Sequence, residues 1–348
     1  MPRMSAELAC ERDALLEDWR SAAFRLQREI GKAILGQDRA VRLLVIAIFA
    51  RGHVLLEGDV GAGKTTMLRA FARAIGGAFE RIEGMVDLMP SDLIYYTYLG
   101  ADGRPRVDPG PVLRNEGDLS IFFFNEINRA RPQVHSLLLR LMAERSVVAL
   151  NRAYRFPHLQ VFADRNRIEK EETFELPAAA RDRFFMEIGI ETPKDADIRR
   201  ALIFDPRFHD VDALVHSVPE NMIDYRDLNV VAQAIQSRVR SSEALERYVV
   251  ALWDAVTEPA AAGIDIPDVD MERLVLGGGS PRGLSYLARA ARVRAWLEGR
   301  DIIVPEDIRD VFVETMAHRI FLHPVYELRR DAIMRDFCRA VFAKVPAP

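Results

Sequence analysis

The chain has 348 residues, 49% of them hydrophobic, and its 48 Lys and Arg residues are nearly balanced by 52 Asp and Glu residues. This length and composition predict a globular protein of about two domains. The net charge of −4 gives no overall basic field and argues against a nucleic-acid ligand. The sequence shows neither a signal peptide nor a membrane span, and Cys10 and Cys338 lie far apart. We therefore expect a cytoplasmic protein without disulfides or a zinc site.

The first predicted elements are helical. Apolar residues at helical spacing indicate a helix within 8–34 and a second, more apolar one over 41–49. Residues 54–190 then alternate short apolar runs with helical patterns. This alternation predicts an α/β fold whose parallel sheet is flanked by helices on both faces. The clearest buried strand candidates are 121–124, 159–163 and 184–190.

The pattern changes after residue 190, which predicts a second, helical region. Thr192, Pro193 and Asp195 have the composition of a helix start, with a capping hydroxyl, a proline at the first helical position and an acid in the first turn. Beyond them we expect helices, interrupted by a loop rich in Gly, Pro and Asp at 260–270. The expected helices are 227–238, 242–256, 282–297, 305–313 and 331–342.

The most informative motif is the run Gly-Asp-Val-Gly-Ala-Gly-Lys-Thr at 58–65, a complete phosphate loop that follows an apolar run and precedes a helical pattern. Gly61 and Gly63 let backbone N–H groups surround phosphate oxygens at the positive end of that helix. We expect Lys64 to pair with the β- and γ-phosphates and Thr65 to offer its hydroxyl to Mg²⁺. The predicted nucleotide-binding residues are Gly58, Asp59, Val60, Gly61, Ala62, Gly63, Lys64, Thr65 and Thr66.

A second motif follows the strand candidate at 121–124. In phosphate-loop proteins such a strand usually ends in Asp-Glu, where the Asp holds Mg²⁺ and the Glu activates the attacking water. Here the pair is Asn125–Glu126. Asn125 lacks the negative charge, a Coulomb contribution on the order of a few kcal/mol at an effective dielectric of about 20, so we expect weaker Mg²⁺ coupling with nucleotide binding retained. In the alternative interpretation, Asn125 only caps the next segment.

The run Asn-Glu-Ile-Asn-Arg-Ala-Arg-Pro at 125–132 resembles the "DEINRA" segment of the MoxR family of AAA+ ATPases. The resemblance extends over about residues 30–325. The run 84–100 and the Asn-Glu variant most resemble the branch found alongside methanol dehydrogenase. Further motifs in the family's order lie at 36–37, 109–112, 176–177, 182–184, 279–282 and 317–320.

The resemblance implies a phosphate-loop (AAA+) core with a parallel sheet, which binds ATP with Mg²⁺, and a smaller all-α lid. The implied divisions are a helical lead-in over 1–35, the nucleotide-binding core over 36–192, a linker over 193–225 and the lid over 226–348.

The resemblance also implies roles for single residues. Glu126 is the expected base, and Asn166 matches the first sensor, which orients the lytic water. Arg183 matches the arginine finger, which reaches the nucleotide of a neighbouring subunit. Arg282 matches the second sensor, which contacts the γ-phosphate of its own subunit. For either arginine the alternative is a surface salt bridge. The residues expected at Mg²⁺ are Thr65 and Asn125.

Two departures from the family pattern bear on the subunit interface. Ala178 stands where the family usually has an acid, and 164–167 reads Asp-Arg-Asn-Arg in place of the usual Thr-Gln-Asn-Pro. The resemblance further implies two inserts on the pore side of a ring. The first contains Tyr95, Tyr96, Tyr98 and Leu99 and continues over 100–111, and the second is a hairpin at 147–156. The alternative is that the tyrosines pack the first insert against the core.

As a function, the resemblance implies a chaperone-like ATPase that assembles into a ring, expected to be a hexamer. With a von Willebrand A-domain partner it would remodel a client metalloenzyme, such as methanol dehydrogenase, or load it with its metal or cofactor. A second hypothesis is an ATP-dependent scaffold that hydrolyses slowly because of Asn125, in which case Asn125→Asp should accelerate hydrolysis. A third is a nucleic-acid motor, because ring helicases carry a similar insert.

Overall fold

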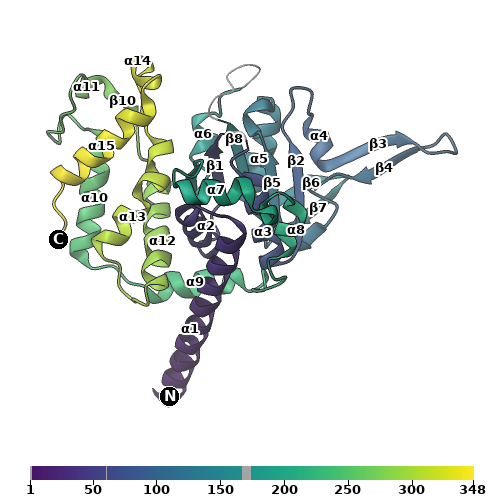
Figure 1. Cartoon of the computed structure of the whole chain (residues 1–348), viewed down its shortest axis with the longest axis horizontal. Coiled ribbons are helices and arrows are strands. Elements are labelled where there is room, and N and C mark those ends of the chain that lie inside the picture. Colours follow the sequence, from purple (N-terminus) through teal and green to yellow (C-terminus); the bar gives the residue numbers. More distant parts are fainter. Residues whose placement is uncertain (1, 60, 167–173) are drawn as a thin grey trace. The chain divides into compact units, whose positions relative to one another are not determined.

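The structure is a computed structural model that describes residues 2–59, 61–166 and 174–348 (Figure 1). Its contacts divide the chain into two compact units. The first comprises Met1–Phe184 and Ile188–Val231, and the second comprises Phe185–Glu187 and Ala232–Pro348. The four-part division that the family resemblance implies stays a prediction. In the described part of the chain, no helix is both long and apolar enough to span a bilayer.

A five-stranded sheet with the order β2-β5-β8-β1-β9 forms the centre of the first unit. Strand β5 pairs in parallel with β2 and β8, and β8 pairs in parallel with β1. Every residue of β5 is buried, as its run of four large apolar residues predicts. The predicted α/β fold class is therefore confirmed. The strands are β1 (Val54–Gly58), β2 (Ala78–Glu83), β5 (Leu119–Asn125), β8 (Gln160–Asn166) and β9 (Met186–Ile190).

Helices flank this sheet, and their apolar faces form the core of the unit. On α3, the apolar side chains of Leu68, Phe71 and Ile75 are all buried. On α5, buried leucines share one hydrophobic cluster with Phe122 and Phe124 of β5, and full burial of such a side chain stabilises the fold by about 1.5–3 kcal/mol. The helices are α1 (Pro2–Ala33), α2 (Asp38–Phe49), α3 (Lys64–Ile75), α4 (Pro90–Ile94), α5 (Pro132–Glu144), α6 (Ala178–Arg181), α7 (Ala196–Phe204) and α8 (Val211–His216), with short 3₁₀ turns η1 (Glu116–Asp118), η2 (Ile127–Arg129) and η3 (Pro206–Phe208).

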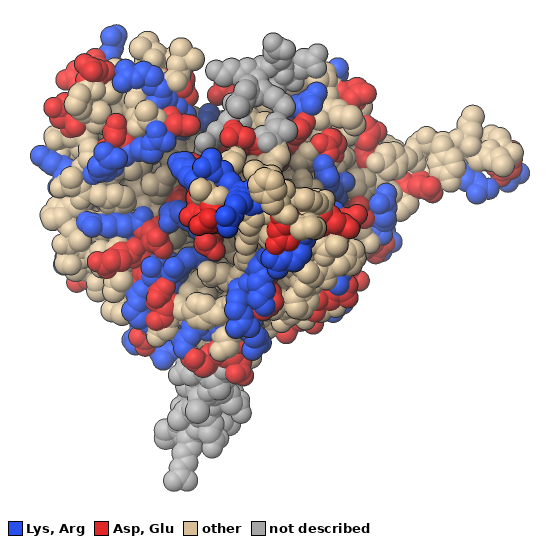
Figure 2. Space-filling model, in the orientation of Figure 1, with Lys and Arg blue, Asp and Glu red and all other residues tan. Residues whose placement is uncertain are grey.

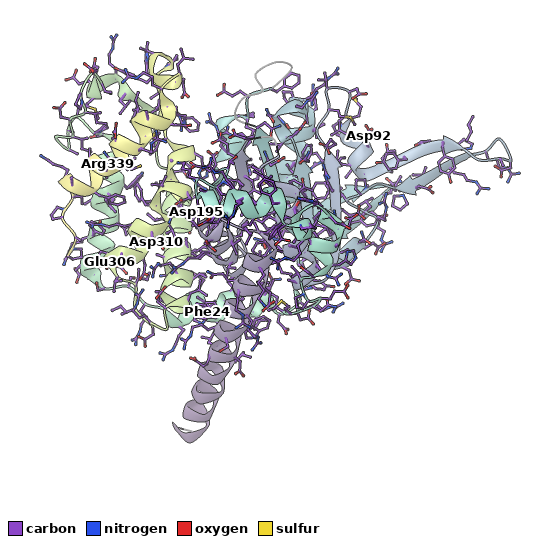
Figure 3. The ribbon with its side chains drawn as sticks, in the orientation of Figure 1. Phe24, Asp92, Asp195, Glu306, Asp310 and Arg339 are labelled. Atoms are coloured by element: carbon purple, nitrogen blue, oxygen red, sulfur yellow. The ribbon has the colours of Figure 1, made fainter. Side chains whose placement is uncertain are left out.

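The start of α7 differs from the sequence-based expectation. The helix begins at Ala196, and its capping residue is Asp195 and not Thr192 (Figure 3). The Asp195 carboxylate accepts hydrogen bonds from the N–H groups of Asp197, at 2.8 Å, and Ile198, at 3.0 Å. These two N–H groups belong to the first turn and have no partner within the helix, so the carboxylate fixes the start here.

The first unit contains two antiparallel hairpins, and the one formed by β3 and β4 projects from it (Figure 1). The first pairs β3 (Tyr95–Leu99) with β4 (Pro105–Pro109), and its Tyr96 and Tyr98 are exposed. Tyr95 instead packs against the core cluster, so the packing interpretation holds for this tyrosine alone. The second hairpin occupies the segment expected at 147–156 and consists of β6 (Ser146–Ala149) and β7 (Arg152–Arg155).

The second unit is mainly helical, and the five helices expected after residue 225 are present with ends within three residues of their predicted positions. It also contains a two-stranded antiparallel sheet that the sequence analysis did not predict. Its strands are too short to show a period-2 pattern. The elements from the division onward are α9 (Leu228–Arg238), α10 (Glu243–Thr257), α11 (Met271–Leu274), β10 (Val275–Gly277), α12 (Pro281–Leu297), α13 (Pro305–Met316), η4 (Ala317–Arg319), β11 (Phe321–Leu322), α14 (Pro324–Glu327) and α15 (Arg330–Lys344).

A buried carboxylate joins α12 to α13. Asp307 is fully buried and accepts hydrogen bonds from Arg300, at 2.6 and 2.7 Å, and from Arg294, at 3.1 Å. It also caps α13 through the N–H of Val304, at 2.9 Å. Arg294 extends the network to Asp310, at 2.8 Å.

We expect Asp307→Ala to lower the free energy of unfolding of the second unit by about 3–5 kcal/mol, because it leaves two arginines without their buried partner. The matched control is Asp301→Ala, which removes a half-exposed ion pair with Arg238 and should cost about 0–1 kcal/mol. Urea unfolding followed by circular dichroism measures both. Equal losses in the two variants would contradict this account of the network.

Candidate nucleotide-binding site

The phosphate loop connects β1 to α3 in the first unit. Gly61 and Gly63 have φ angles of 78° and 83°, a region that L-residues rarely adopt, and Gly63 is the N-cap of α3. The first turn of α3 contains no acidic residue, so its unpaired N–H groups are available to an anion. The loop therefore has the backbone geometry that the motif predicts. Val60, one of the predicted nucleotide-binding residues, lies outside the described residues.

The ammonium group of Lys64 is buried among oxygen atoms. It donates to the carbonyl of Gly58, at 2.8 Å, and to Oδ1 of Asn166, at 2.7 Å. It also lies 3.4 Å from a carboxylate oxygen of Asp164. Gly58 ends β1 and Asn166 ends β8, and the two residues pair in register. The parallel register thus brings the first-sensor candidate to the lysine of the phosphate loop.

Glu126 is part of the same network. It directly follows β5 with a φ of 52°, and its Oε1 accepts a hydrogen bond from Nδ2 of Asn166, at 3.3 Å. Its other oxygen forms an ion pair with Arg129, at 3.0 Å. The structure therefore brings the predicted base, the first-sensor residue and Lys64 together, although they are far apart in the sequence.

Asn125 is buried at the end of β5, and its side-chain amide donates a hydrogen bond to Glu83 on the neighbouring strand β2. The capping interpretation does not hold, because the N-cap residue of the following turn is Glu126. The amide of Asn125 is thus engaged by a carboxylate on the side of β2.

Asp164, to which neither a motif nor the family resemblance gives a role, is a central residue of the network. Its side chain is 1% exposed, and one oxygen accepts a hydrogen bond from the N–H of Glu126, at 2.5 Å. Burial raises the pKa of this carboxyl group, while the N–H of Glu126 and the nearby Lys64 oppose that rise. The only sequence signal was an acid near the carboxyl end of a strand candidate. The strand order shows that this strand lies next to β1 and thus brings Asp164 to Lys64.

Comparisons with known proteins agree with this geometry. Residues 53–186 match the "ATPase family associated with various cellular activities (AAA)", and residues 271–336 match the AAA lid domain. The chain is 68% identical to protein MoxR of Methylorubrum extorquens over 97% of this chain and 98% of that protein. The chain belongs to the MoxR family of AAA+ ATPases. The predicted family is confirmed, and membership implies nucleotide binding, normally with Mg²⁺.

Other MoxR relatives are more distant. Protein MoxR of Paracoccus denitrificans is 56% identical over 97% of this chain and 99% of its own length. Chaperone MoxR1 of Mycobacterium tuberculosis is 34% identical over 88% of this chain and 76% of that protein. A crystal structure of a Cytophaga hutchinsonii protein named as a candidate ATPase superimposes with a TM-score of 0.82 at 29% identity, and the match covers 99% of each chain.

The two arginines that the MoxR resemblance singles out belong to different units of the chain. Arg183 is half-buried just after α6, where its guanidinium donates to the carbonyl of Ala179, at 2.7 Å. Arg282 is exposed in the first turn of α12 in the second unit, and Ser280 caps that helix by accepting from the N–H of Gly283, at 3.0 Å. Their sensor and finger roles stay predictions.

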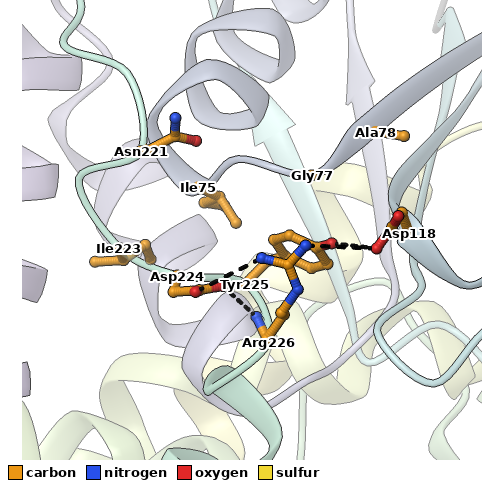
Figure 4. A pocket seen from close by; sticks show the side chains of 9 residues that line it. All are labelled: Ile75, Gly77, Ala78, Asp118, Asn221, Ile223, Asp224, Tyr225 and Arg226. Atoms are coloured by element: carbon orange, nitrogen blue, oxygen red, sulfur yellow. Dashed lines mark hydrogen bonds and ion pairs between the residues drawn. The ribbon is translucent and has the colours of Figure 1, made fainter.

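A separate cavity of about 520 Å³ lies at the opposite ends of the strands, where their amino termini are (Figure 4). It adjoins Ala78 and Asp118, at the amino ends of β2 and β5, whereas the phosphate loop follows the carboxyl end of β1. Within it, burial and a hydrogen bond to Asp118, at 2.7 Å, raise the pKa of Tyr225 to about 12. Ligands of open α/β sheets bind at carboxyl ends, so this cavity is not part of the nucleotide site.

Gly84 lies at the end of β2 against the backbone of Asn125 and Glu126. Its N–H donates to the carbonyl of Asn125, at 2.7 Å. A Cβ atom at this position would lie 2.1 Å from the carbonyl oxygen of Glu126. Because this neighbour is backbone, a larger residue must displace Glu126 itself.

We expect Gly84→Ala to retain ATP binding and to lower ATP hydrolysis by about 10²-fold, the usual cost of misplacing a catalytic group by about 1 Å. The matched control is Gly31→Ala on α1, where a Cβ would meet no atom within 4 Å. Steady-state phosphate release and nucleotide titration measure the two effects. Full hydrolysis in Gly84→Ala would show that the position of Glu126 does not depend on this contact.

Proposed function

We propose that this chain hydrolyses ATP with Mg²⁺ as part of a ring assembly that remodels a client protein. The observation that carries the proposal is the hydrogen-bonded network that joins Lys64, Asn166 and Glu126 beside the phosphate loop. A phosphate-binding cation, a water-orienting amide and a carboxylate base are the groups that phosphoryl transfer to water requires.

In this proposal, the backbone amides of the loop and the ammonium group of Lys64 bind the phosphates. Asn166, released from Lys64, orients the attacking water, and Glu126 accepts its proton. Thr65 offers its hydroxyl to Mg²⁺, which supplies positive charge that stabilises the phosphates in the transition state. In this proposal the ion is bound jointly with the nucleotide, since Mg²⁺ is usually held by one or two protein ligands together with substrate phosphates.

The proposed ring, which we expect to be a hexamer, completes the site. AAA+ proteins typically form oligomeric rings, and Arg183 would reach the nucleotide of a neighbouring subunit. Arg282 would contact the γ-phosphate of its own subunit as the second sensor. Neither role follows from the contacts of a single chain.

The proposed substrate of the assembly is a protein. A relative of this chain is named a chaperone, and the family resemblance supports a von Willebrand A-domain partner and a client metalloenzyme in the cytoplasm, with methanol dehydrogenase as the first client to test. Figure 2 shows Lys and Arg side chains interspersed with Asp and Glu on the visible face, and with the net charge of −4 this favours a protein client over a nucleic-acid track.

A slowly hydrolysing scaffold is the second candidate function, and the neutral Asn125 favours it. Such a protein would bind ATP and assemble at a normal affinity but release phosphate slowly. The rate of the unmodified protein in the assay below separates the two functions.

We expect Lys64→Ala to lose ATP binding, because it removes the only cation that the loop motif itself supplies. We expect Glu126→Gln to bind ATP and to hydrolyse it about 10²–10⁴-fold more slowly, the usual contribution of a general base. Fluorescent-nucleotide titration and phosphate release measure binding and turnover. Lys194→Ala, which changes an exposed lysine, is the matched control, and equal turnover in all four proteins would refute ATP hydrolysis at this site.

Mixing experiments test whether Arg183 acts between subunits. We expect Arg183→Ala alone to hydrolyse ATP about 10³-fold more slowly, and Arg200→Ala, at another exposed arginine, to be unaffected. Mixing Arg183→Ala with Glu126→Gln should restore part of the activity, since some sites then combine an intact Glu126 with an intact Arg183 from the neighbour. A mixture no more active than its components would place Arg183 outside the neighbour's site.

A further inference from the structure

The observation that leads further is a row of polar residues across three adjacent strands. Glu83 on β2 pairs in register with Asn125 on β5. Phe124 on β5 pairs with Ala163 on β8, so Asn125 and Asp164 come next at the same level of these two strands. In a parallel sheet, residues at the same level point to the same face. The side chains of Glu83, Asn125 and Asp164 therefore form one row that reads carboxylate, amide, carboxylate.

Within this row, Asn125 and Asp164 have different partners. Asn125 donates to Glu83, on the side away from the phosphate loop. Asp164 lies on the strand between β5 and β1, and its carboxylate is 3.4 Å from the ammonium group of Lys64. The anionic side chain of the row nearest to the phosphate loop thus comes from β8 and not from the end of β5.

The carboxylate of Asp164 can accept more hydrogen bonds or bind a cation in addition to its present partners. Burial of a carboxylate is costly unless its oxygens are paired. One oxygen accepts from the N–H of Glu126 and the other faces Lys64, yet a carboxylate has about four acceptor positions. When Lys64 turns to a phosphate, the oxygen that faces it gains capacity for another donor or cation.

The oxygens present here suit Mg²⁺. This ion prefers oxygen ligands, keeps several of its waters, and is usually held by one or two carboxylates together with substrate phosphates. Thr65 at the start of α3 offers a hydroxyl, and Asp164 offers a carboxylate beside Lys64 of the phosphate loop. Asn125 offers only a neutral oxygen on a side chain already bonded to Glu83.

We propose that Asp164 on β8 supplies the carboxylate for nucleotide-bound Mg²⁺ that is missing at Asn125 on β5, and that it holds the ion's water together with Thr65. This inference rests on the proposed ATP site and adds a metal-site residue to it. It also changes one expectation from the sequence. Asn125→Asp alone would place a third carboxylate between Glu83 and Asp164, where like charges disfavour ionisation, so it should not accelerate hydrolysis.

The competing role for Asp164 is that of a counter-ion for Lys64 only. The two roles predict opposite results when the carboxylate is neutralised. A counter-ion competes with the phosphates for Lys64, so its removal should tighten nucleotide binding equally with and without Mg²⁺. A metal-site carboxylate strengthens only the binding of the Mg²⁺ complex, so its removal should reduce the effect of Mg²⁺ and leave binding in EDTA unchanged.

The test is titration of the full-length protein with a fluorescent ADP analogue, in Mg²⁺ and in EDTA. We compare the unmodified protein with Asp164→Asn and with the double variant Asn125→Asp plus Asp164→Asn, which moves the carboxylate to β5. We expect Mg²⁺ to tighten binding by the unmodified protein, Asp164→Asn to lose about 10–100-fold of the affinity for the Mg²⁺ complex, and the double variant to regain it. Asp212→Asn, at an exposed acid on α8, is the matched control.

Electron paramagnetic resonance of Mn²⁺ in the ADP complex provides a second readout, which should show weakened Mn²⁺ retention only in Asp164→Asn. A full Mg²⁺ effect in Asp164→Asn, or tighter binding regardless of Mg²⁺, would overturn the proposal. If that variant does not fold by circular dichroism, the double variant decides: a folded double variant that shows no Mg²⁺ effect also overturns it. Absence of nucleotide binding by the unmodified protein would instead refute the ATP site as a whole.

Discussion

The pairing of one buried ammonium group organises the polar residues of the first unit. Lys64 is 7% exposed, and a charge at such a depth requires oxygen partners. They come from the end of β1, through the carbonyl of Gly58, and from the end of β8, through Asn166 and Asp164. Any strand order that separated β8 from β1 would remove Asn166 and Asp164 and leave this ammonium with the carbonyl of Gly58 as its remaining named partner, so the site and the sheet depend on each other.

The same constraint explains why the candidate catalytic residues meet at the carboxyl ends of the central strands. Strands β5, β8 and β1 are adjacent and parallel, so their carboxyl ends lie together although the intervening chain is long. Glu126 follows β5 with a left-handed backbone conformation, and its N–H is fixed by Asp164 on the next strand. The position of the proposed base is thus set by neighbouring strands and by the close approach of Gly84, and not by the local sequence alone.

Elements that depend on short stretches of sequence were predicted correctly more often than features that depend on tertiary contacts. The phosphate loop, the strand β5, the helices α1 and α2 and the five long helices after residue 225 follow from motifs and periodicity within short windows, and they agree with the structure. The cap of α7 was misplaced because Thr192 and Asp195 both fit a helix start, and only the hydrogen bonds of Asp195 decide between them. The β10–β11 pair was not predicted because strands of two or three residues are too short to show a periodic pattern.

By itself, the sequence determined the phosphate loop, the α/β class and the family, because each depends on residue types at fixed spacing along the chain. Only the tertiary structure decided that Asp164 lies beside Lys64 and that Asn125 is engaged by Glu83. Both facts depend on which strands are neighbours and in which register they pair. A one-dimensional pattern does not encode that choice directly, since it results from the packing and hydrogen bonding of the whole sheet.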